Sequence, residues 1–429
     1  MDNEHRITMN TLPLVATAAE GLCIWQPGHG EPVHTSSPHA RELTCLRWTS
    51  DDRVVASGSR DGCVVLTRLG QAADTLQVAT PGSGVAVLSL TWSPGSRYLA
   101  TGASDGMVRV LDLQKGVQAL TLRGHRAAVC ALSWSPSEVH VASASDVGAI
   151  LIHRVQGSVA LVARFEHPPT PTGSPLSSTA SPVAVGYLQW APFQQALLAS
   201  AADDGAVCLW EAAPGSGGAS GLNAPLYMFR EHSAACSGLQ WSPVNQHLLV
   251  TSAADGWLLF YDVTKRIMLR AIQLDAAVTA FCLSADSTHL ACGSAVGELS
   301  LFDLRRDEEE PVWVVQAHSS PLRGVSFQRV GVPPHALAAP GAISGKQSPA
   351  AIASPAATRN GGVSRCGSVE RAEVAAASSP TASSPMASPS HAAPSWLPSR
   401  LLGAVAEPPV WRSARGGDRK SVAQGKCVP

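Results

Sequence analysis

The sequence predicts an all-β protein, a seven-bladed β-propeller followed by a disordered C-terminal tail. Three observations lead to this prediction. A pattern of an apolar strand, a terminal Trp and a later Asp-Gly turn recurs through the first three quarters of the 429 residues. No stretch of that region has the 3.6-residue periodicity of an amphipathic helix. The remaining residues are mostly Ala, Ser, Pro and Gly, a composition that buries too little apolar surface to fold.

The composition allows a large core and hints at a repeated position. Hydrophobic residues make up 45% of the chain, whereas charged residues make up only 15%, below the usual ~25%. Trp supplies 11 of the 22 aromatic residues. Such a bias towards one rare residue indicates that Trp fills the same structural position several times.

Several classes of protein are not expected. No apolar run approaches the ~18–20 residues that span a bilayer, and the first residues, Met1 to His5, lack the basic and then apolar order of a signal peptide. The ten Cys residues form no C-x-x-C pair, so they fit small buried side chains in a reducing compartment. We therefore expect a cytoplasmic protein without a membrane partner.

The strand that ends in Trp sets the repeat length. Its anchors are Trp48, Trp92, Trp134, Trp190 and Trp241, continued by Leu283 and Phe327, at spacings of 44, 42, 56, 51, 42 and 44. The two long gaps contain low-complexity segments rich in Pro, Gly and Ser, at 168–182 and 214–225, which we interpret as loop insertions. Without them the period is about 42 residues, which is typical of propeller blades.

Two further landmarks recur with the anchors, a turn dipeptide after the anchor and, at four anchors, a His before it. Asp-Gly follows at Asp61, Asp105, Asp204 and Asp255, with degenerate copies at 146–148 and 296–297; this dipeptide between apolar runs predicts a hairpin. The position five residues after each turn Gly also recurs from repeat to repeat. Its occupants are Thr67, Leu111, His153, Trp210, Tyr261 and Phe302. A His lies nine residues before four anchors, at His39, His125, His232 and His318.

Counting the repeats predicts how the ring closes. Six full repeats begin at the anchors 48 to 283, but the seventh inner strand, 322–328, has no partner strands after it. The N-terminal residues 12–36 supply two apolar runs that could complete the blade. The seventh blade should therefore combine both ends of a domain at 5–328, because otherwise two open sheet edges would be exposed. The disordered tail then covers 329–429.

With these landmarks in a fixed order, residues 5–328 resemble the WD40-repeat family. The resemblance implies that each His joins a hydrogen-bond network with the turn Asp, a Ser or Thr and a Trp of its blade. The same His could serve in acid–base catalysis, and the turn acids could bind a cation, but the acids would be spread around the ring. No phosphate-binding loop, nucleophile elbow or zinc-protease motif is present. We expect no catalytic residue, cofactor, metal or small-molecule substrate, so the partners should be proteins.

The tail differs from the body in charge and motifs. It holds 11 basic and 4 acidic residues, a net +7, whereas the rest has 20 and 28, a net −8. Its Arg residues are scattered without aromatic neighbours, which argues against nucleic-acid binding. The apolar segment 395–402 is interpreted either as a peptide docking motif or as incidental sequence. Five Ser-Pro pairs are candidate sites for proline-directed phosphorylation: Ser348, Ser354, Ser379, Ser384 and Ser388.

Finer similarity favours one WD40 group. The segments 35–39, 242–251, 260–262, 277–305 and 317–328 resemble the WD-repeat family that targets the γ-tubulin ring complex, in its plant and algal form. This resemblance implies a non-catalytic scaffold at the spindle, centrosome or basal body, acting in microtubule nucleation and mitotic spindle assembly. It implies localisation to the cytoskeleton at a microtubule-organising centre or spindle pole. The chain departs from the family after Gln328, where no helical pattern for γ-tubulin binding follows.

A second hypothesis is a substrate receptor of a cullin-RING ubiquitin ligase. Phe302-Asp303-Leu304-Arg305 resembles the W-D-x-R box that some WD proteins use. The alternative interpretation of this tetrapeptide is a strand end with a solvated Arg. An enzyme, the third class, would need a catalytic site that the sequence does not display.

Overall fold

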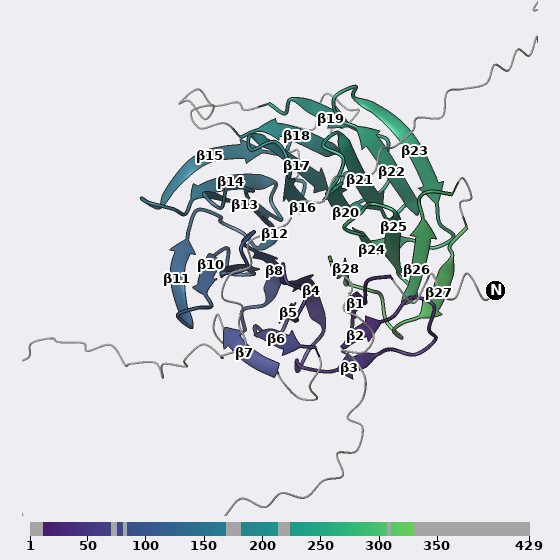
Figure 1. Ribbon diagram of the computed structural model, residues 1–429. Helices are drawn as coiled ribbons and strands as arrows, with labels where there is room; N and C mark the ends of the chain where they lie inside the picture. Colours follow the sequence, from purple (N-terminus) through teal and green to yellow (C-terminus); the bar gives the residue numbers. More distant parts are fainter. Residues whose placement is uncertain are drawn as a thin grey trace, which may run out of the picture. The chain divides into compact units, whose positions relative to one another are not determined.

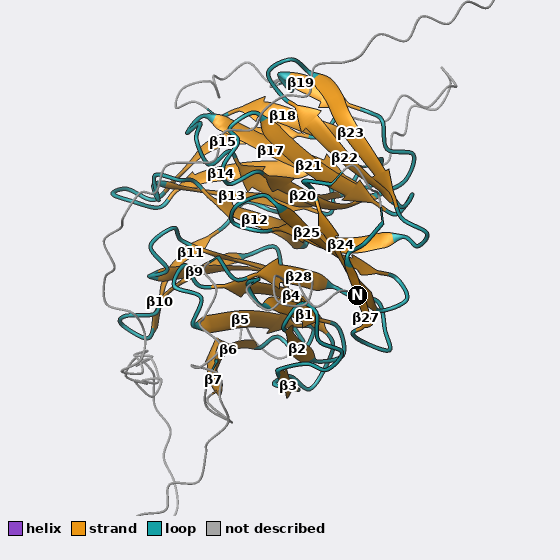
Figure 2. Cartoon of the chain, turned by 45° about the vertical axis from the view of Figure 1, so that its right-hand side comes forward, coloured by secondary structure: helices purple, strands orange, loops and turns teal. Residues whose placement is uncertain are grey.

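The computed structural model describes residues 12–69, 75–79, 84–168, 182–212, 224–306 and 310–329. Within these ranges the chain forms 28 β-strands and no helix. The strands make seven four-stranded antiparallel sheets arranged as the blades of a ring (Figure 1), and Figure 2 shows strands and loops alone in the described chain. The predicted all-β, seven-bladed propeller is confirmed. The disorder predicted for the tail concerns 330–429, outside the described residues.

Each of the six full blades runs in chain order from the innermost strand to the outermost. Blade 1 consists of β4 (Leu43–Trp48), β5 (Val54–Ser59), β6 (Val64–Arg68) and β7 (Thr75–Ala79). Blade 2 consists of β8 (Val87–Trp92), β9 (Tyr98–Ala103), β10 (Val108–Asp112) and β11 (Val117–Leu122). Blade 3 consists of β12 (Val129–Trp134), β13 (His140–Ser145), β14 (Ala149–Arg154) and β15 (Ala160–Glu166).

The next three blades repeat this order. Blade 4 consists of β16 (Val185–Trp190), β17 (Leu197–Ala202), β18 (Val207–Glu211) and β19 (Tyr227–Phe229). Blade 5 consists of β20 (Cys236–Trp241), β21 (Leu248–Ala253), β22 (Trp257–Asp262) and β23 (Ile267–Gln273). Blade 6 consists of β24 (Val278–Leu283), β25 (His289–Ser294), β26 (Glu298–Asp303) and β27 (Trp313–Gln316).

Blade 7 joins the two ends of the ring. Its inner strand β28 (Gly324–Phe327) pairs with β1 (Val15–Ala18), which continues to β2 (Leu22–Trp25) and β3 (His34–Ser36). The antiparallel register sets Val15 opposite Phe327. Gln328 extends the junction, since its side-chain Nε2 donates to the carbonyl of Asp52 in blade 1 at 3.0 Å. The strand β28 contacts β24 on one side and β4 on the other, so the circle is complete.

Small residues on each second strand allow neighbouring blades to approach closely. A Cβ placed on Gly58 of β5 would lie 2.8 Å from a methyl group of Val87 in blade 2. A Cβ on Gly102 of β9 would lie 2.7 Å from Val129 in blade 3. This spacing explains why the second strands are rich in Ala, Ser and Gly, whereas five of the seven inner strands begin with Val or Leu. The hydrophobic core is therefore divided into apolar layers, each of which lies between two neighbouring blades.

Bulges shape the edges of the blades. The longer outermost strands, β7, β11, β15 and β23, each carry a register shift against their partner. The other outermost strands are only three or four residues long. A bulged or very short edge is a poor template for pairing with another strand. The described outer rim is thus protected from strand addition at every blade.

The anchor Trp residues connect blades. Each lies at the end of an inner strand, and three of them donate a hydrogen bond from Nε1 to a main-chain carbonyl of the preceding blade: Trp48 to Ser326 at 3.0 Å, Trp92 to Arg47 at 3.1 Å and Trp241 to Gln189 at 3.1 Å. The Nε1 atoms of Trp134 and Trp190 are buried without a partner. The landmark that repeats in the sequence is therefore, at three boundaries, a link between blades.

We predict that Gly293→Ala destabilises the propeller. A Cβ at this position would lie 2.7 Å from Cβ of Leu322, at the packed boundary between blades 6 and 7. Overpacking of this kind costs about 1–3 kcal/mol, which urea denaturation measures. The control is Gly30→Ala, where nothing lies within 4 Å of the added methyl group. Equal unfolding midpoints for the two variants would contradict the close packing described above.

Replacing two anchor Trp residues by Phe should have unequal effects. Trp241→Phe removes a hydrogen bond between blades, the one that Nε1 donates to the Gln189 carbonyl, a loss of about 1 kcal/mol beyond the change in packing. Trp134→Phe removes an indole nitrogen that has no partner, so it should cost less. Chemical denaturation of both variants measures the difference. A larger loss for Trp134→Phe would refute the role of the inter-blade bond.

Candidate functional site

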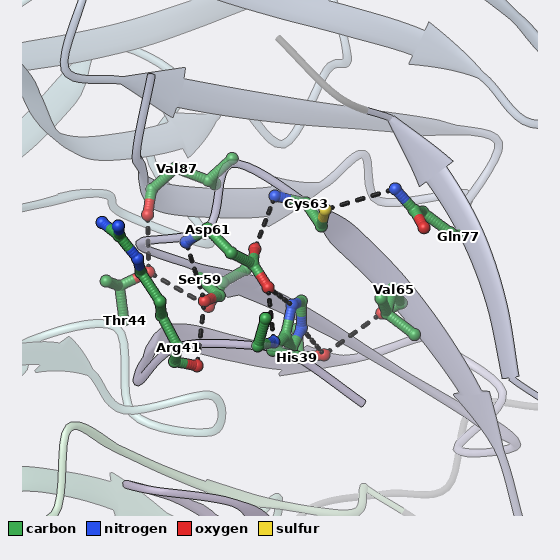
Figure 3. A network of polar contacts seen from close by, with 12 residues as sticks. His39, Arg41, Thr44, Ser59, Asp61, Cys63, Val65, Gln77 and Val87 are labelled. Atoms are coloured by element: carbon green, nitrogen blue, oxygen red, sulfur yellow. Dashed lines mark hydrogen bonds and ion pairs between the residues drawn. The ribbon is translucent and has the colours of Figure 1, made fainter. Parts of the chain in front are cut away.

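The predicted His and Asp landmarks meet at one end of the blades. In blade 1 the loop before β4 brings His39 onto the β5–β6 turn, where Nδ1 lies 3.2 Å from Asp61 Oδ2 (Figure 3). The other ring nitrogen, Nε2, lies 2.9 Å from Ser57 Oγ. Asp61 also accepts bonds from the main-chain N–H groups of Ala40 and Cys63 at 2.9 and 2.7 Å. The contacts fasten the loop between blades to the hairpin turn.

Blade 5 repeats this arrangement with different partners. His232 lies 3.3 Å from Asp255 and 2.8 Å from Thr251 Oγ1. Asp255 accepts from the N–H groups of Ser233 and Trp257, at 2.9 and 3.0 Å. Blades 1 and 5 are the two in which the structure brings a predicted His and a predicted Asp together.

Blade 4 uses a His that the repeat spacing did not identify. Asp204 pairs with His167 Nε2 at 3.2 Å, and Trp210 donates to Ser200 Oγ at 2.8 Å. His167 precedes its anchor Trp190 by 23 residues because the predicted insertion 168–182 lies between them. Aligning the residues on either side of that insertion would have found it.

Blade 7 forms its network from both ends of the ring. His318 Nε2 lies 2.9 Å from Thr17 Oγ1, which also accepts from Trp25 Nε1 at 3.0 Å. Glu20 takes the place of the turn Asp, 3.5 Å from His318 Nδ1. The repeat landmarks missed Glu20 and Trp25 because the β1–β2 turn is short and carries Glu-Gly in place of Asp-Gly.

The remaining blades lack the full network. In blade 3, His125 Nε2 lies 2.8 Å from Ser143 Oγ, but Nδ1 is buried without a partner. In blade 2, Asp105 pairs with Arg109 at 2.5 Å. Blade 6 has Val296-Gly297 at the turn. The five candidate phosphorylation sites, Ser348 to Ser388, lie outside the described residues.

The electrostatics of the networks favour a neutral His beside an ionised Asp. Burial lowers the pKa of His39 and His232, and their Asp partners only partly oppose this effect. Burial raises the pKa of Asp61 and Asp255, but main-chain N–H groups outweigh it and hold each pKa below its usual value. The side chains of His39, His167 and His232 are 0% exposed, so no substrate reaches these rings. The geometry of these networks therefore serves to hold the loops between blades in position.

Neither a metal-binding cluster nor a membrane-spanning helix occurs among the described residues. They contain no group of three or more His, Cys, Asp or Glu side chains placed to hold a metal ion. Among the same residues, no helix is long and apolar enough to cross a membrane.

An exposed apolar strip lies on the outer strand of blade 5, where Ile267, Met268 and Leu269 are 47%, 46% and 54% exposed. Such a strip offers area for protein binding.

We predict that acid destabilises the propeller between pH 6.5 and about 4. Burial, together with repulsion from His153 and Arg164, lowers the pKa of His125 to about 4, from 6.5. The unfolded chain therefore binds more protons in this window, so stability is complete above pH 6.5 and is lost as the pH falls. The urea midpoint, measured against pH, should fall less steeply for His125→Gln. The same pH dependence for both proteins would show that His125 is not responsible.

Comparisons with known proteins agree with the geometry of the blades. Residues 46–137 match the family described as the anaphase-promoting complex subunit 4 WD40 domain, and residues 223–262 match the WD domain, G-beta repeat family. A chain from a structure titled "Crystal Structure of Mitotic Checkpoint Complex" superimposes with a TM-score of 0.55 at 22% identity, over 66% of this chain and 82% of that one. This likeness shows the fold.

Sequence similarity extends over 318 residues, 73% of the chain. Protein NEDD1 of Bos taurus and of Mus musculus is 29% identical, and that of Homo sapiens 26% identical, each over 318 residues and 73% of this chain. The chain covers 44% of the length of these relatives. With its seven blades and its Asp, His and Trp landmarks, the protein is a seven-bladed β-propeller with repeats similar to the WD40 family and a sequence similar to NEDD1.

Proposed function

We propose that this protein is a non-catalytic WD40 scaffold that targets γ-tubulin ring complexes to spindle, centrosome or basal-body sites, where it promotes microtubule nucleation. The observation that carries the proposal is the similarity to NEDD1 over 318 residues. A second support is that the segments resembling the γ-tubulin-targeting family lie inside the propeller. Its partners would be proteins, and it would localise to microtubule-organising centres.

The site geometry supports binding in place of catalysis. The rings of three His residues that could act as acids or bases are fully buried and hydrogen-bonded to the protein. Their contacts hold the loops that join the blades, and a rigid arrangement of surface loops is what a scaffold needs. The surface, including the apolar strip on β23, would then bind the partners.

The division of labour within the chain follows from this proposal. We assign partner binding to the propeller at 5–328 and regulation to the tail at 329–429. Phosphate on tail residues such as Ser348 or Ser388 would add about −1.5 to −2 charge each, enough for a few groups to cancel the tail's net +7.

The second candidate, a ligase substrate receptor, rests on Arg305. Its side chain is 60% exposed, and it follows the end of β26 by two residues; its Nε and Nη2 contact Asp303, the last residue of the strand, at 2.8 and 2.7 Å. The exposure favours a contact with a partner. The same pairing, however, occurs between Lys265 and Asp262 in blade 5 at 3.5 Å, outside any W-D-x-R box, so it also fits an ordinary strand end.

One purification from dividing cells tests both candidates. Tagged full-length protein should co-purify with γ-tubulin and be enriched at microtubule-organising centres under the microscope. Arg305→Ala should leave both results unchanged, as should the control Lys265→Ala, because each side chain contacts only a neighbouring Asp on its own blade.

Two results would contradict the proposal. Tagged protein that is evenly spread and free of γ-tubulin would exclude the targeting role. Co-purification of a cullin adaptor that is lost in Arg305→Ala but retained in Lys265→Ala would favour the ligase receptor.

A further inference from the structure

Five Ser-Pro dipeptides lie in the described residues, and three of them have a structural role. Ser93, Ser135 and Ser242 are buried. Their hydroxyl oxygens accept hydrogen bonds from main-chain N–H groups at the far side of the turn that follows each inner strand: those of Tyr98 and His140, which begin the next strands, and that of Asn245 in the turn itself. A kinase could not reach these three hydroxyl groups without unfolding a blade.

The other two, Ser37-Pro38 and Ser320-Pro321, lie on either side of blade 7. Ser37 is exposed in the loop between β3 and β4, and Ser320 is partly exposed in the loop between β27 and β28. Although far apart in sequence, both approach the β1–β2 turn. Ser320 Oγ donates a hydrogen bond to Glu20 Oε2, and Ser37 Oγ would lie 3.5 Å from a Cβ placed on Gly21.

Glu20 holds the loop that leads into the last strand. Its Oε1 accepts from the N–H and the hydroxyl of Ser319 at 3.0 and 3.2 Å, in addition to the bond from Ser320. These bonds join residues about 300 positions apart, and they cross the seam where the ring closes. We call Glu20, Ser319 and Ser320 the closure clasp.

We propose that Ser320 is a phosphorylation site for a proline-directed kinase and that its modification releases the closure clasp. The Pro321 that follows supplies the dipeptide such kinases recognise, and the partial exposure of Ser320 supplies access. In the reaction the Ser320 oxygen attacks the γ-phosphorus of ATP, an O–P bond forms, the bond to the β–γ bridging oxygen breaks and ADP leaves. The hydroxyl proton passes to solvent through the kinase.

The charges explain why the clasp opens. Burial opposes ionisation of Glu20, but the hydrogen bonds from Ser320 and Ser319 outweigh it and lower its pKa to about 2. A phosphate carrying about −1.5 to −2 would therefore face a carboxylate at neutral pH. The titratable neighbours of Glu20 are His318 and Cys23. Burial lowers the pKa of His318 and raises that of Cys23, so both are neutral and neither offsets the repulsion. The hydroxyl proton that bonded Glu20 is also lost.

The release would loosen the seam without opening the ring. The main-chain pairing from Val15 with Phe327 to Ala18 with Gly324 does not involve the clasp. The loop 317–323 and the β1–β2 turn would separate, which changes the surface of blade 7 at the end where the His networks lie. The device acts on the propeller itself and does not depend on γ-tubulin binding.

The full chain, treated with a cyclin-dependent kinase and ATP, tests this proposal. Mass spectrometry should find phosphate on Ser320, and the midpoint of thermal unfolding should fall by about 3 °C, a shift that a modest loss of stability gives in a domain of this size. Ser320→Ala, which keeps every other Ser-Pro site, should not show this fall. Ser37→Ala is the matched control on the same face and should respond like the natural chain.

The variant Glu20→Gln distinguishes repulsion between the Ser320 phosphate and the Glu20 carboxylate from any other effect of phosphorylation on stability. This variant should start from a lower midpoint, because it weakens the clasp, and should lose less than about 1 °C on phosphorylation. An unmodified Ser320 in a sample whose tail Ser-Pro sites are phosphorylated would overturn the proposal. An equal fall in the natural chain and in Glu20→Gln would overturn it as well.

Discussion

The close approach of neighbouring blades is the constraint on which the propeller depends. A second strand that carried large side chains would push the next inner strand away, and seven such displacements would open the ring. Gly58, Gly102 and Gly293 leave room for a Val or Leu of the next blade within van der Waals distance. The apolar layers between blades then form an unbroken series around the ring, and they bury surface that a four-stranded sheet alone would leave exposed. The final layer exists only because β1 pairs with β28.

Much of this architecture could be predicted because the repeat is marked by residues whose role depends on the local backbone geometry. Trp at the end of a strand and Asp-Gly at a turn each reflect short-range geometry, so seven blades could be counted from the sequence. The partners of these residues were less predictable. His167 was hidden by an insertion. Glu20 lies in a shortened turn, and Trp25 lies at the end of the strand β2 that follows this turn. The bonds from Trp48, Trp92 and Trp241 cross blade boundaries, so they depend on tertiary contacts that spacing does not encode.

The polar networks show how one motif tolerates variation. Blades 1, 4 and 5 keep the pair of His and Asp, blade 7 substitutes Glu, and blades 2, 3 and 6 retain only parts. Packing between blades carries the fold where a network is incomplete. Each variation changes the loops on the same end of the ring. The sequence differences between blades therefore give that end an irregular chemistry, which a scaffold can use to distinguish partners.

The bulged and shortened outer strands bear on how densely such molecules can be gathered. Propellers are rich in β-structure, and crowding many copies at one small organelle would favour fibrils if their rims could zip together. The interruptions in β7, β11, β15 and β23 remove the regular ladder that such growth requires. Copies of such a propeller held at high local concentration would remain separate molecules that exchange freely with others in solution.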